Sequence, residues 1–188
     1  MATVPVIPSF VAGERPTAAK MNASGKTPLD FLMNPPRVNA VYATNGIPAL
    51  VDGATQVVVP LATEAWDTDG MHSTTTNPSR ITFNTPGLYQ ITFFARFLSN
   101  SAGTRSINLR LNSGGLPAAG STLNTWVFTA TNGSSSSFSR TVDYLATVGD
   151  HIEMWVSANT GNASTVTLDA GDRVTGMHVR WVATDNTS

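Results

Sequence analysis

The strictest constraint on the fold is the run GLYQITFFARF at residues 87–97, in which apolar side chains occupy every second position. One face of this run carries Tyr89, Ile91, Phe93, Ala95 and Phe97. The other face carries Leu88, Gln90, Thr92, Phe94 and Arg96. A period of two predicts a long β-strand that is half buried against a core. The turn NTPG at 84–87 favours a type II geometry at the start of this strand.

Similar alternation recurs along the rest of the chain. Further strands are predicted at residues 106–111, 123–131, 138–145, 152–158, 165–168 and 174–183. Turn residues separate these segments about every ten positions, which leaves no room for crossover helices. The sequence therefore predicts an all-β fold, an antiparallel jelly-roll sandwich, preceded by an extended N-terminal arm with short helical turns.

The chain divides into an N-terminal anchoring arm, residues 1–56, and a jelly-roll domain, residues 57–188. Much of the proline lies in the arm, and clear strand periodicity begins after it. The apolar side chains of the arm need a surface on which to lie, either the chain's own domain or another protein. The second interpretation makes the arm a docking segment. Its predicted docking side chains are Phe10, Val11, Met21, Leu29, Phe31, Leu32 and Met33.

Two separate helical turns are predicted within the arm. Thr17 caps the first turn, at 18–21, and the asparagine and glycine that follow end it. The second turn begins with Thr27 as its N-cap and Pro28 at the first helical position, and it stops at 34–36. Both turns are shorter than the ~12–15 residues at which isolated helices become marginally stable, so they depend on packing.

The composition argues against several classes of function. Charged residues make up 12% of the chain and the formal net charge is −1, so there is no basic surface for a nucleic-acid backbone. The chain has no cysteine, which removes disulfides and thiolate metal sites. No apolar run reaches the roughly 18–20 residues of a membrane span, and the N-terminus does not resemble a signal peptide. We expect no cofactor, no nucleic-acid or membrane partner, and synthesis in the cytoplasm.

The stretch WDTDGMH at 66–72 is the first candidate for a chemical site. Asp67 and Asp69 are spaced as at the start of a calcium loop, but the further oxygen ligands and the distal glutamate do not follow in register. Aspartates also form turns, because their carboxylates accept hydrogen bonds from nearby backbone N–H groups, and Gly70 relaxes the corner. A corner of the fold is the preferred interpretation, and a bound cation is the alternative.

The sequence contains no recognisable catalytic motif. His72, His151 and His178 are not spaced as a metal-binding pair, and no serine is marked as a nucleophile. A pair of carboxylates for glycoside hydrolysis stays open, because a sequence does not give distances across a fold. The candidates for such a pair are Glu64, Asp67, Asp69, Asp143 and Glu153. The preferred prediction is a protein that is not an enzyme.

Large aromatic residues recur within the alternating segments, where packing in a core or a subunit interface is their usual use. The residues predicted for this role, in the core or a trimer interface, are Trp66, Tyr89, Phe93, Trp126, Tyr144, Trp155 and Trp181. A sugar-stacking platform is the alternative. The polar loops at 99–103, 131–137 and 159–163 are solvated turns, and they are also where a receptor contact would be carried.

Three segments occur in an order that is typical of one family. They are 64–72 (EAWDTDGMH), 78–89 (PSRITFNTPGLY) and 148–153 (VGDHIE). This order resembles the globular head domain of complement component one-q, one of the tumour-necrosis-factor-like jelly rolls, over roughly Val57 to Thr184. The resemblance implies a homotrimer packed around a threefold axis. The absence of a collagen-like stalk and of a signal peptide argues against a secreted animal protein.

The arm carries a second resemblance, at 8–22 (PSFVAGERPTAAKMN) and 29–36 (LDFLMNPP). These segments are similar to the N-terminal segment of structural proteins from tailed bacteriophages of actinobacteria. Together the two resemblances imply a virion protein, made in the host cytoplasm, whose arm anchors on the particle and whose trimeric jelly roll faces outward.

Two virion functions are left open by the sequence. The first is a decoration protein on the capsid exterior, with the major capsid protein as its partner, that stabilises the head. The second is a minor tail or fibre protein, with tail proteins as partners, that binds a host-surface glycan through the loops at 99–103 or 131–137.

Overall fold

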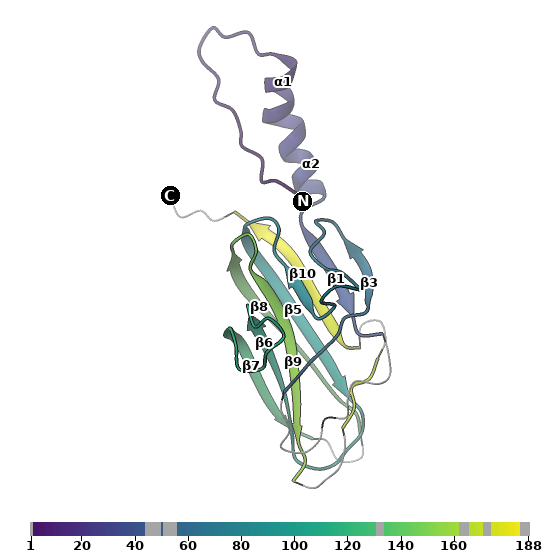
Figure 1. Cartoon of the computed structure of the whole chain (residues 1–188). Helices are drawn as coiled ribbons and strands as arrows, with labels where there is room; N and C mark the ends of the chain where they lie inside the picture. The colour runs from purple at the N-terminus through teal and green to yellow at the C-terminus, as the bar shows by residue number, and fades with distance from the viewer. Residues whose placement is uncertain are drawn as a thin grey trace.

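The computed structural model describes residues 2–43, 50, 56–130, 134–161, 166–170 and 174–184, which form two antiparallel β-sheets packed face to face (Figure 1). The first sheet has the strand order β3-β1-β10-β5-β8, and the second has the order β2-β9-β6-β7 with β4 paired to β9. The strands are β1 (Arg37–Val41), β2 (Val57–Val58), β3 (Thr63–Asp67), β4 (Arg80–Thr82), β5 (Gly87–Phe97), β6 (Thr104–Leu111), β7 (Ser121–Thr129), β8 (Ser136–Ala146), β9 (His151–Asn159) and β10 (Gly176–Ala183). The predicted antiparallel all-β sandwich is confirmed.

The long strand β5 shows the burial that its alternation predicts. Tyr89, Ile91 and Phe93 are fully buried, whereas the residues between them are half exposed. The second sheet faces them with Ile107 of β6 and Met154 of β9, which are also fully buried. Each such side chain contributes about 1.5–3 kcal/mol of transfer free energy when it leaves water. The core of the protein therefore lies between the two sheets.

Strand β1 lies within residues 1–56, which the sequence division assigned to the arm. It pairs with β10 on one side and β3 on the other, so it is an interior strand of the first sheet. Val38 and Ala40 are fully buried because they face the second sheet. The sandwich therefore begins at Arg37 rather than after residue 56.

The prediction of two separate helical turns in the arm is wrong. The helix α1 (Ala18–Met21), a π-helical turn (Asn22–Lys26) and the helix α2 (Thr27–Met33) follow one another without a break. Thr27 has helical dihedral angles, and its N–H donates a hydrogen bond to the carbonyl of Asn22. This wider turn lets the helix continue through the residues that were expected to end it. The predicted cap at Thr17 is confirmed, since its side chain accepts a hydrogen bond from the Lys20 N–H.

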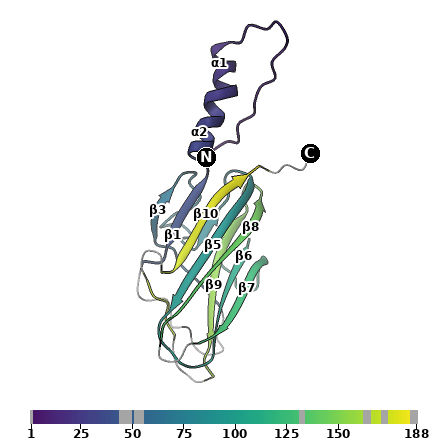
Figure 2. The same cartoon turned by 180° about the vertical axis from the view of Figure 1, so that it is seen from behind.

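The arm is a hairpin that projects from one end of the sandwich, with an extended leg beside the helix (Figures 1 and 2). At its base, the ring of Phe31 packs edge-on against Trp181, with centroids 4.9 Å apart. The start of the leg is held by the carboxylate of Asp69, which accepts a hydrogen bond from the Ala2 N–H, and the Thr85 hydroxyl oxygen lies 2.6 Å from the Ala2 carbonyl oxygen. At its tip, Glu14 pairs with Lys20. No helix among the described residues is long and apolar enough to cross a membrane.

The turn that connects β8 to β9 depends on the carboxylate of Asp150. Burial alone would raise the pKa of Asp150, but hydrogen bonds from Asn112, Thr147 and Tyr144 outweigh burial and lower this pKa from 3.8 to about 2. A lowered pKa means that the ionised carboxylate stabilises the folded state above pH 3.8, and that this stabilisation is lost as the pH falls through 2.

We expect Asp150→Asn to lower the urea midpoint of unfolding at pH 7, because the amide cannot accept all of these hydrogen bonds. Urea titrations of both proteins at several pH values check this prediction. The difference between them should shrink as the pH falls from 4 to 2. A difference that stays constant over this range would contradict an ionised Asp150 as the source of the stability.

Candidate functional site

The corner WDTDGMH uses its carboxylates to hold the fold together. Asp67 accepts hydrogen bonds from the backbone N–H groups of Asp69 and His72, each over 2.9 Å. Asp69 is buried and accepts hydrogen bonds from the Thr85 hydroxyl, over 2.8 Å, and from the N–H of Ala2. The structure thus supports the interpretation as a corner, and it adds a role that the sequence did not reveal, the attachment of the N-terminal leg. The described residues contain no group of three or more His, Asp or Glu side chains that could hold a metal ion.

The other candidate carboxylates have separate surroundings. Glu64 pairs with the ring of His72 over 3.1 Å, at the edge of the first sheet. Glu153 is buried in the second sheet, where it accepts hydrogen bonds from the Ser113 hydroxyl and the Gly115 N–H. Asp143 is exposed on β8, and its carboxylate forms no hydrogen bond or ion pair with another described residue. Glu64 and Glu153 therefore have structural partners, and Asp143 is a free surface charge. These three carboxylates do not form a facing acid and base.

The predicted aromatic residues divide between the core and the surface. Tyr89, Phe93 and Trp155 are buried. Tyr144 and Trp181 are partly buried and pack against the core. The remaining two, Trp66 and Trp126, lie at the surface, and each is covered on one side by an arginine side chain. Trp66 and Trp126 thus mark two separate surface regions where a partner could contact the sandwich.

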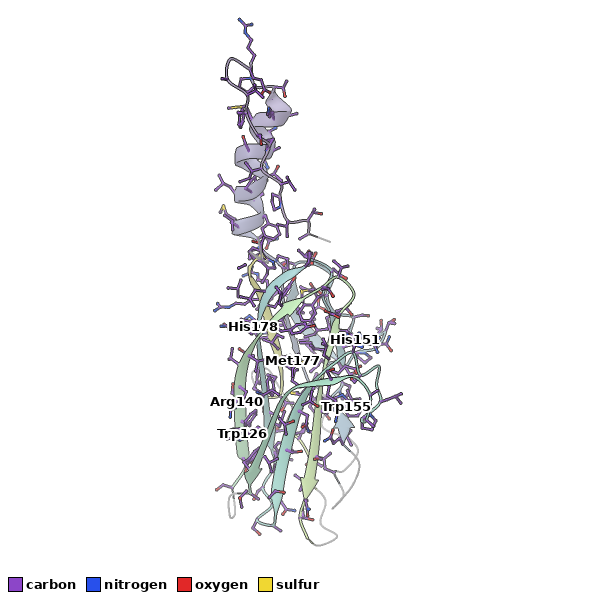
Figure 3. All side chains as sticks on the ribbon, turned by 90° about the vertical axis from the view of Figure 1, so that its left-hand side faces the viewer. Trp126, Arg140, His151, Trp155, Met177 and His178 are labelled. Atoms are coloured by element: carbon purple, nitrogen blue, oxygen red, sulfur yellow. The ribbon has the colours of Figure 1, made fainter. Side chains whose placement is uncertain are left out.

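Trp126 lies on an edge where the sandwich is open, between β7 at the end of the second sheet and β8 at the end of the first. Trp126 is 39% exposed, and the guanidinium of Arg140 lies 3.8 Å from its ring centroid. Figure 3 labels the two side chains next to each other. Beneath this pair, Phe128 and Phe138 stack with centroids 5.9 Å apart. We call the residues Trp126, Val127, Phe128, Phe138 and Arg140 the open edge. Two edge strands with exposed aromatic and apolar side chains are typical of an assembly surface.

Trp66 lies on the other candidate surface, the outer face of the first sheet. Its ring meets the His178 ring edge-on, with centroids 5.0 Å apart. Burial lowers the pKa of His178, and the neighbouring guanidinium groups of Arg180 and Arg37 lower it further, so the imidazole is neutral at pH 7. A hollow of about 520 Å³ opens here. It is lined by Asn39, Trp66, Phe94, Phe138, Ser139, Val174 and His178.

The predicted docking residues of the arm are mostly accessible. Side chains of this group that are at least half exposed are Phe10, Val11, Met21, Leu29, Leu32 and Met33. Phe31 is the exception: it is 8% exposed, because it packs on Trp181 at the base of the arm. Phe31 therefore attaches the arm to the sandwich, while the other six side chains are free to contact a partner.

No protein-family model matches the chain, and no curated protein is similar to it in sequence. Solved structures are similar in fold. The globular domain of zebrafish complement 1qA matches 80% of this chain and 98% of its own length, with a TM-score of 0.56 and 13% sequence identity. The fold is that of the complement and tumour-necrosis-factor jelly rolls. The crystal structure of murine APRIL at pH 8.5 matches 78% of this chain and 98% of its own, with a TM-score of 0.57 and 11% identity.

The jelly roll predicted from the order of the three family-like segments is thus confirmed as a fold. In this jelly roll the open edge lies between the two sheets on one side, and the hollow lies on the outer face of the first sheet. The resemblance of the arm to phage virion proteins is not tested by these similarities and stays a prediction.

Proposed function

We propose that this protein is a structural protein of a bacteriophage virion, a homotrimeric decoration protein that docks on the capsid exterior through its arm. The observation that carries this proposal is the arm itself, an ordered projection whose apolar side chains face solvent. The exposed apolar side chains of the arm are Val6, Ile7, Phe10, Val11, Met21, Leu29, Leu32 and Met33. Exposed apolar side chains gathered on one short segment favour a contact with another protein. The resemblance of the arm to phage proteins supplies that partner, the major capsid protein.

The open edge and the jelly-roll fold support the homotrimer. Each strand of the edge is unpaired on its outer side, and burial of Trp126 and Val127 against a second copy would remove them from water. Three arms would then project from the same end of the trimer. Docking segments that act together gain affinity through their effective concentration, by about 10²–10⁴-fold over one segment alone. Three modest contacts therefore suffice for firm attachment to a head.

A minor tail or fibre protein that binds a host-surface glycan is the second candidate. The hollow beside Trp66 favours it, since an indole ring together with Asn39, Ser139 and His178 suits a saccharide. Of the two loops predicted to bind a glycan, 99–103 has the carbonyls of Asn100 and Ala102 bonded to the buried guanidinium of Arg105. The other, 131–137, lies partly outside the described residues.

The copy number per virion tests the two candidates against each other. Quantitative mass spectrometry of purified virions should find copies in the hundreds, in a fixed ratio to the major capsid protein. A handful of copies would overturn decoration and favour the tail or fibre protein. Absence from virions would overturn both candidates. As a second readout, heads assembled without the protein should lose their DNA at a lower temperature.

A further inference from the structure

A pocket of about 290 Å³ lies between the corner WDTDGMH and β4. Pockets for drug-sized ligands occupy roughly 300–1,000 Å³, so this one suits a small group. Among the described residues, no carboxylate lines it. Its polar side chains, which we call the polar pocket, belong to Ser73, Thr76, Asn77, Arg80, Thr82 and Asn84. The guanidinium of Arg80 therefore gives the polar pocket a positive charge.

Arg80 is only loosely engaged by the rest of the chain. Its Nε atom lies 3.5 Å from the Glu153 carboxylate and, although buried, forms no hydrogen bond. The remaining N–H groups of Arg80 have no hydrogen-bond partner among the described residues. Glu153 already accepts hydrogen bonds from Ser113 and Gly115, and it lies between Arg80 of β4 and Arg110 of β6 in the strand pairing. One carboxylate between two guanidinium groups leaves a positive charge at the pocket.

An apolar groove adjoins the polar pocket. It is lined by Val4 of the leg, by Pro86, and by Leu145 and Val148 at the end of β8 and in the turn after it. We call these four residues the apolar groove. Leu145 and Val148 are exposed to solvent. Asn84 lines both the pocket and the groove, so the two lie side by side.

The pocket and the groove lie at the end of the sandwich from which the arm projects (Figures 1 and 2). The amide of Asn84 donates a hydrogen bond to the carbonyl of Asp69, over 3.0 Å, and the Asp69 carboxylate holds the start of the leg. Val6 and Ile7 follow in the leg and are mostly exposed. The apolar surface thus continues from the groove into the arm, and a protein that covers the base of the arm also covers the pocket.

We propose that the polar pocket receives an aspartate or glutamate side chain of the protein on which the arm docks, and that the apolar groove receives an apolar side chain of the same segment. The carboxylate accepts hydrogen bonds from the N–H groups of Arg80, since guanidinium and carboxylate groups pair through two parallel hydrogen bonds. The Thr82 hydroxyl and the Asn77 amide line the same space and supply further donors.

A carboxylate side chain fits the polar pocket better than a saccharide does. No aromatic side chain of the part of the chain that the structure describes lines this pocket, so it lacks the stacking surface that the hollow beside Trp66 offers. The inference rests on the docking of the proposed function, because it names the chemistry of the surface on which the arm docks. It does not require the trimer.

Arg80→Gln tests the charge of the pocket, with cosedimentation with particles assembled without the protein as the measurement. We expect this variant to bind at least about tenfold more weakly than the wild type, as is usual for close interfacial charge pairs. Added salt should weaken binding of the wild type more than binding of the variant, because salt screens the pair. Arg96→Gln is the matched control: it removes an equal charge at the opposite end of β5, where Arg96 pairs with Asp169, and should bind as the wild type does.

Asn77→Asp separates binding from folding, because it keeps Arg80 and its contact with Glu153. Asn77 has a φ of +50°, a conformation that aspartate also tolerates. The added carboxylate lies in the pocket and repels an incoming one, so binding should weaken by a similar factor while the thermal midpoint stays unchanged. If Arg80→Gln fails to fold, Asn77→Asp decides the question alone.

Val148→Asp tests the apolar groove in the same assay. It places a charge where an apolar side chain of the partner would be buried, so binding to particles should fall clearly below that of the wild type. Leu98→Asp is the control, since Leu98 is an exposed apolar residue directly after β5, at the far end of the sandwich. It should leave particle binding unchanged.

The outcomes distinguish the pocket from docking itself. Wild-type protein that binds particles, with unchanged binding by Arg80→Gln and Asn77→Asp, would overturn the pocket and leave docking intact. A wild type that does not bind particles would overturn both. Glucuronate is the probe for a saccharide ligand. If the wild type binds glucuronate, Arg80→Gln does not, and both bind particles equally, the pocket holds an acidic saccharide and the inference is wrong.

Discussion

Replacing Gly103 with alanine is expected to destabilise the protein by more than about 4 kcal/mol, a large part of the 5–15 kcal/mol that holds a typical domain folded. Gly103 has a φ of +70°, and an added Cβ would lie 1.7 Å from the carbonyl oxygen of Asn159. That oxygen belongs to β9, whose last residue pairs with the first residue of β6. Neither backbone can retreat without breaking the pairing of the two strands. Loss of folded protein on expression, or a much lower urea midpoint, is the expected measurement.

Gly149→Ala is the matched control for this prediction. Gly149 also has a positive φ, +91°, but an added Cβ there meets nothing within 4 Å. Only backbone strain remains at this position, which costs about 1–3 kcal/mol. Urea titrations of the two variants separate strain from steric overlap. Equal midpoints would show that the β6–β9 junction can relax, and would contradict the overlap as the cause.

The sequence predicts an element well when the residue pattern of that element alone indicates its structure. β5 alternates over its whole length, and every residue on one face of it is buried. The sequence did not predict β1, because this strand is short and directly follows Pro36. Its apolar residues Val38 and Ala40 nevertheless alternate with polar ones, and both are buried in the structure. The two-turn prediction for the arm failed for a related reason. Local residue preferences favour an end at Gly25, but a wider helical turn costs little when the next segment is already helical.

The candidate assembly surfaces depend on strand order, which the sequence does not give. Alternation places Trp126 within a strand, but only the sheet order shows that β7 and β8 are edges and leave its ring accessible. Arg37 and Arg180 are far apart in the chain, and their unfavourable juxtaposition follows from the pairing of β1 with β10. The docking role of the arm residues stays a prediction, and the structure shows only that six of the seven side chains are exposed. Phe31 is buried, unlike the other predicted docking residues, because its position in α2 turns it toward Trp181.

The double variant Leu32→Asp/Met33→Asp is expected to bind particles at least about a hundredfold more weakly than the wild type. Both side chains are exposed, at 63% and 84%, so the jelly roll should keep its stability and its trimeric state. Every arm of a trimer carries the change, so the whole gain of about 10²–10⁴-fold from joint docking is lost along with each single contact. Cosedimentation of purified protein with particles assembled without it, followed by mass spectrometry, measures this effect.

Two further variants separate docking from attachment of the arm. Lys26→Gln/Asp30→Asn removes an exposed ion pair on the same helix and should bind particles as the wild type does, because exposed pairs contribute roughly 0–1 kcal/mol. Phe31→Ala keeps Leu32 and Met33 but removes the ring that packs on Trp181. It should lower both the thermal midpoint and particle binding, whereas the Asp double variant lowers binding alone. If the Asp double variant binds within threefold of the wild type, the helix is not the docking element, and the extended leg with Val6 and Ile7 is the next surface to change.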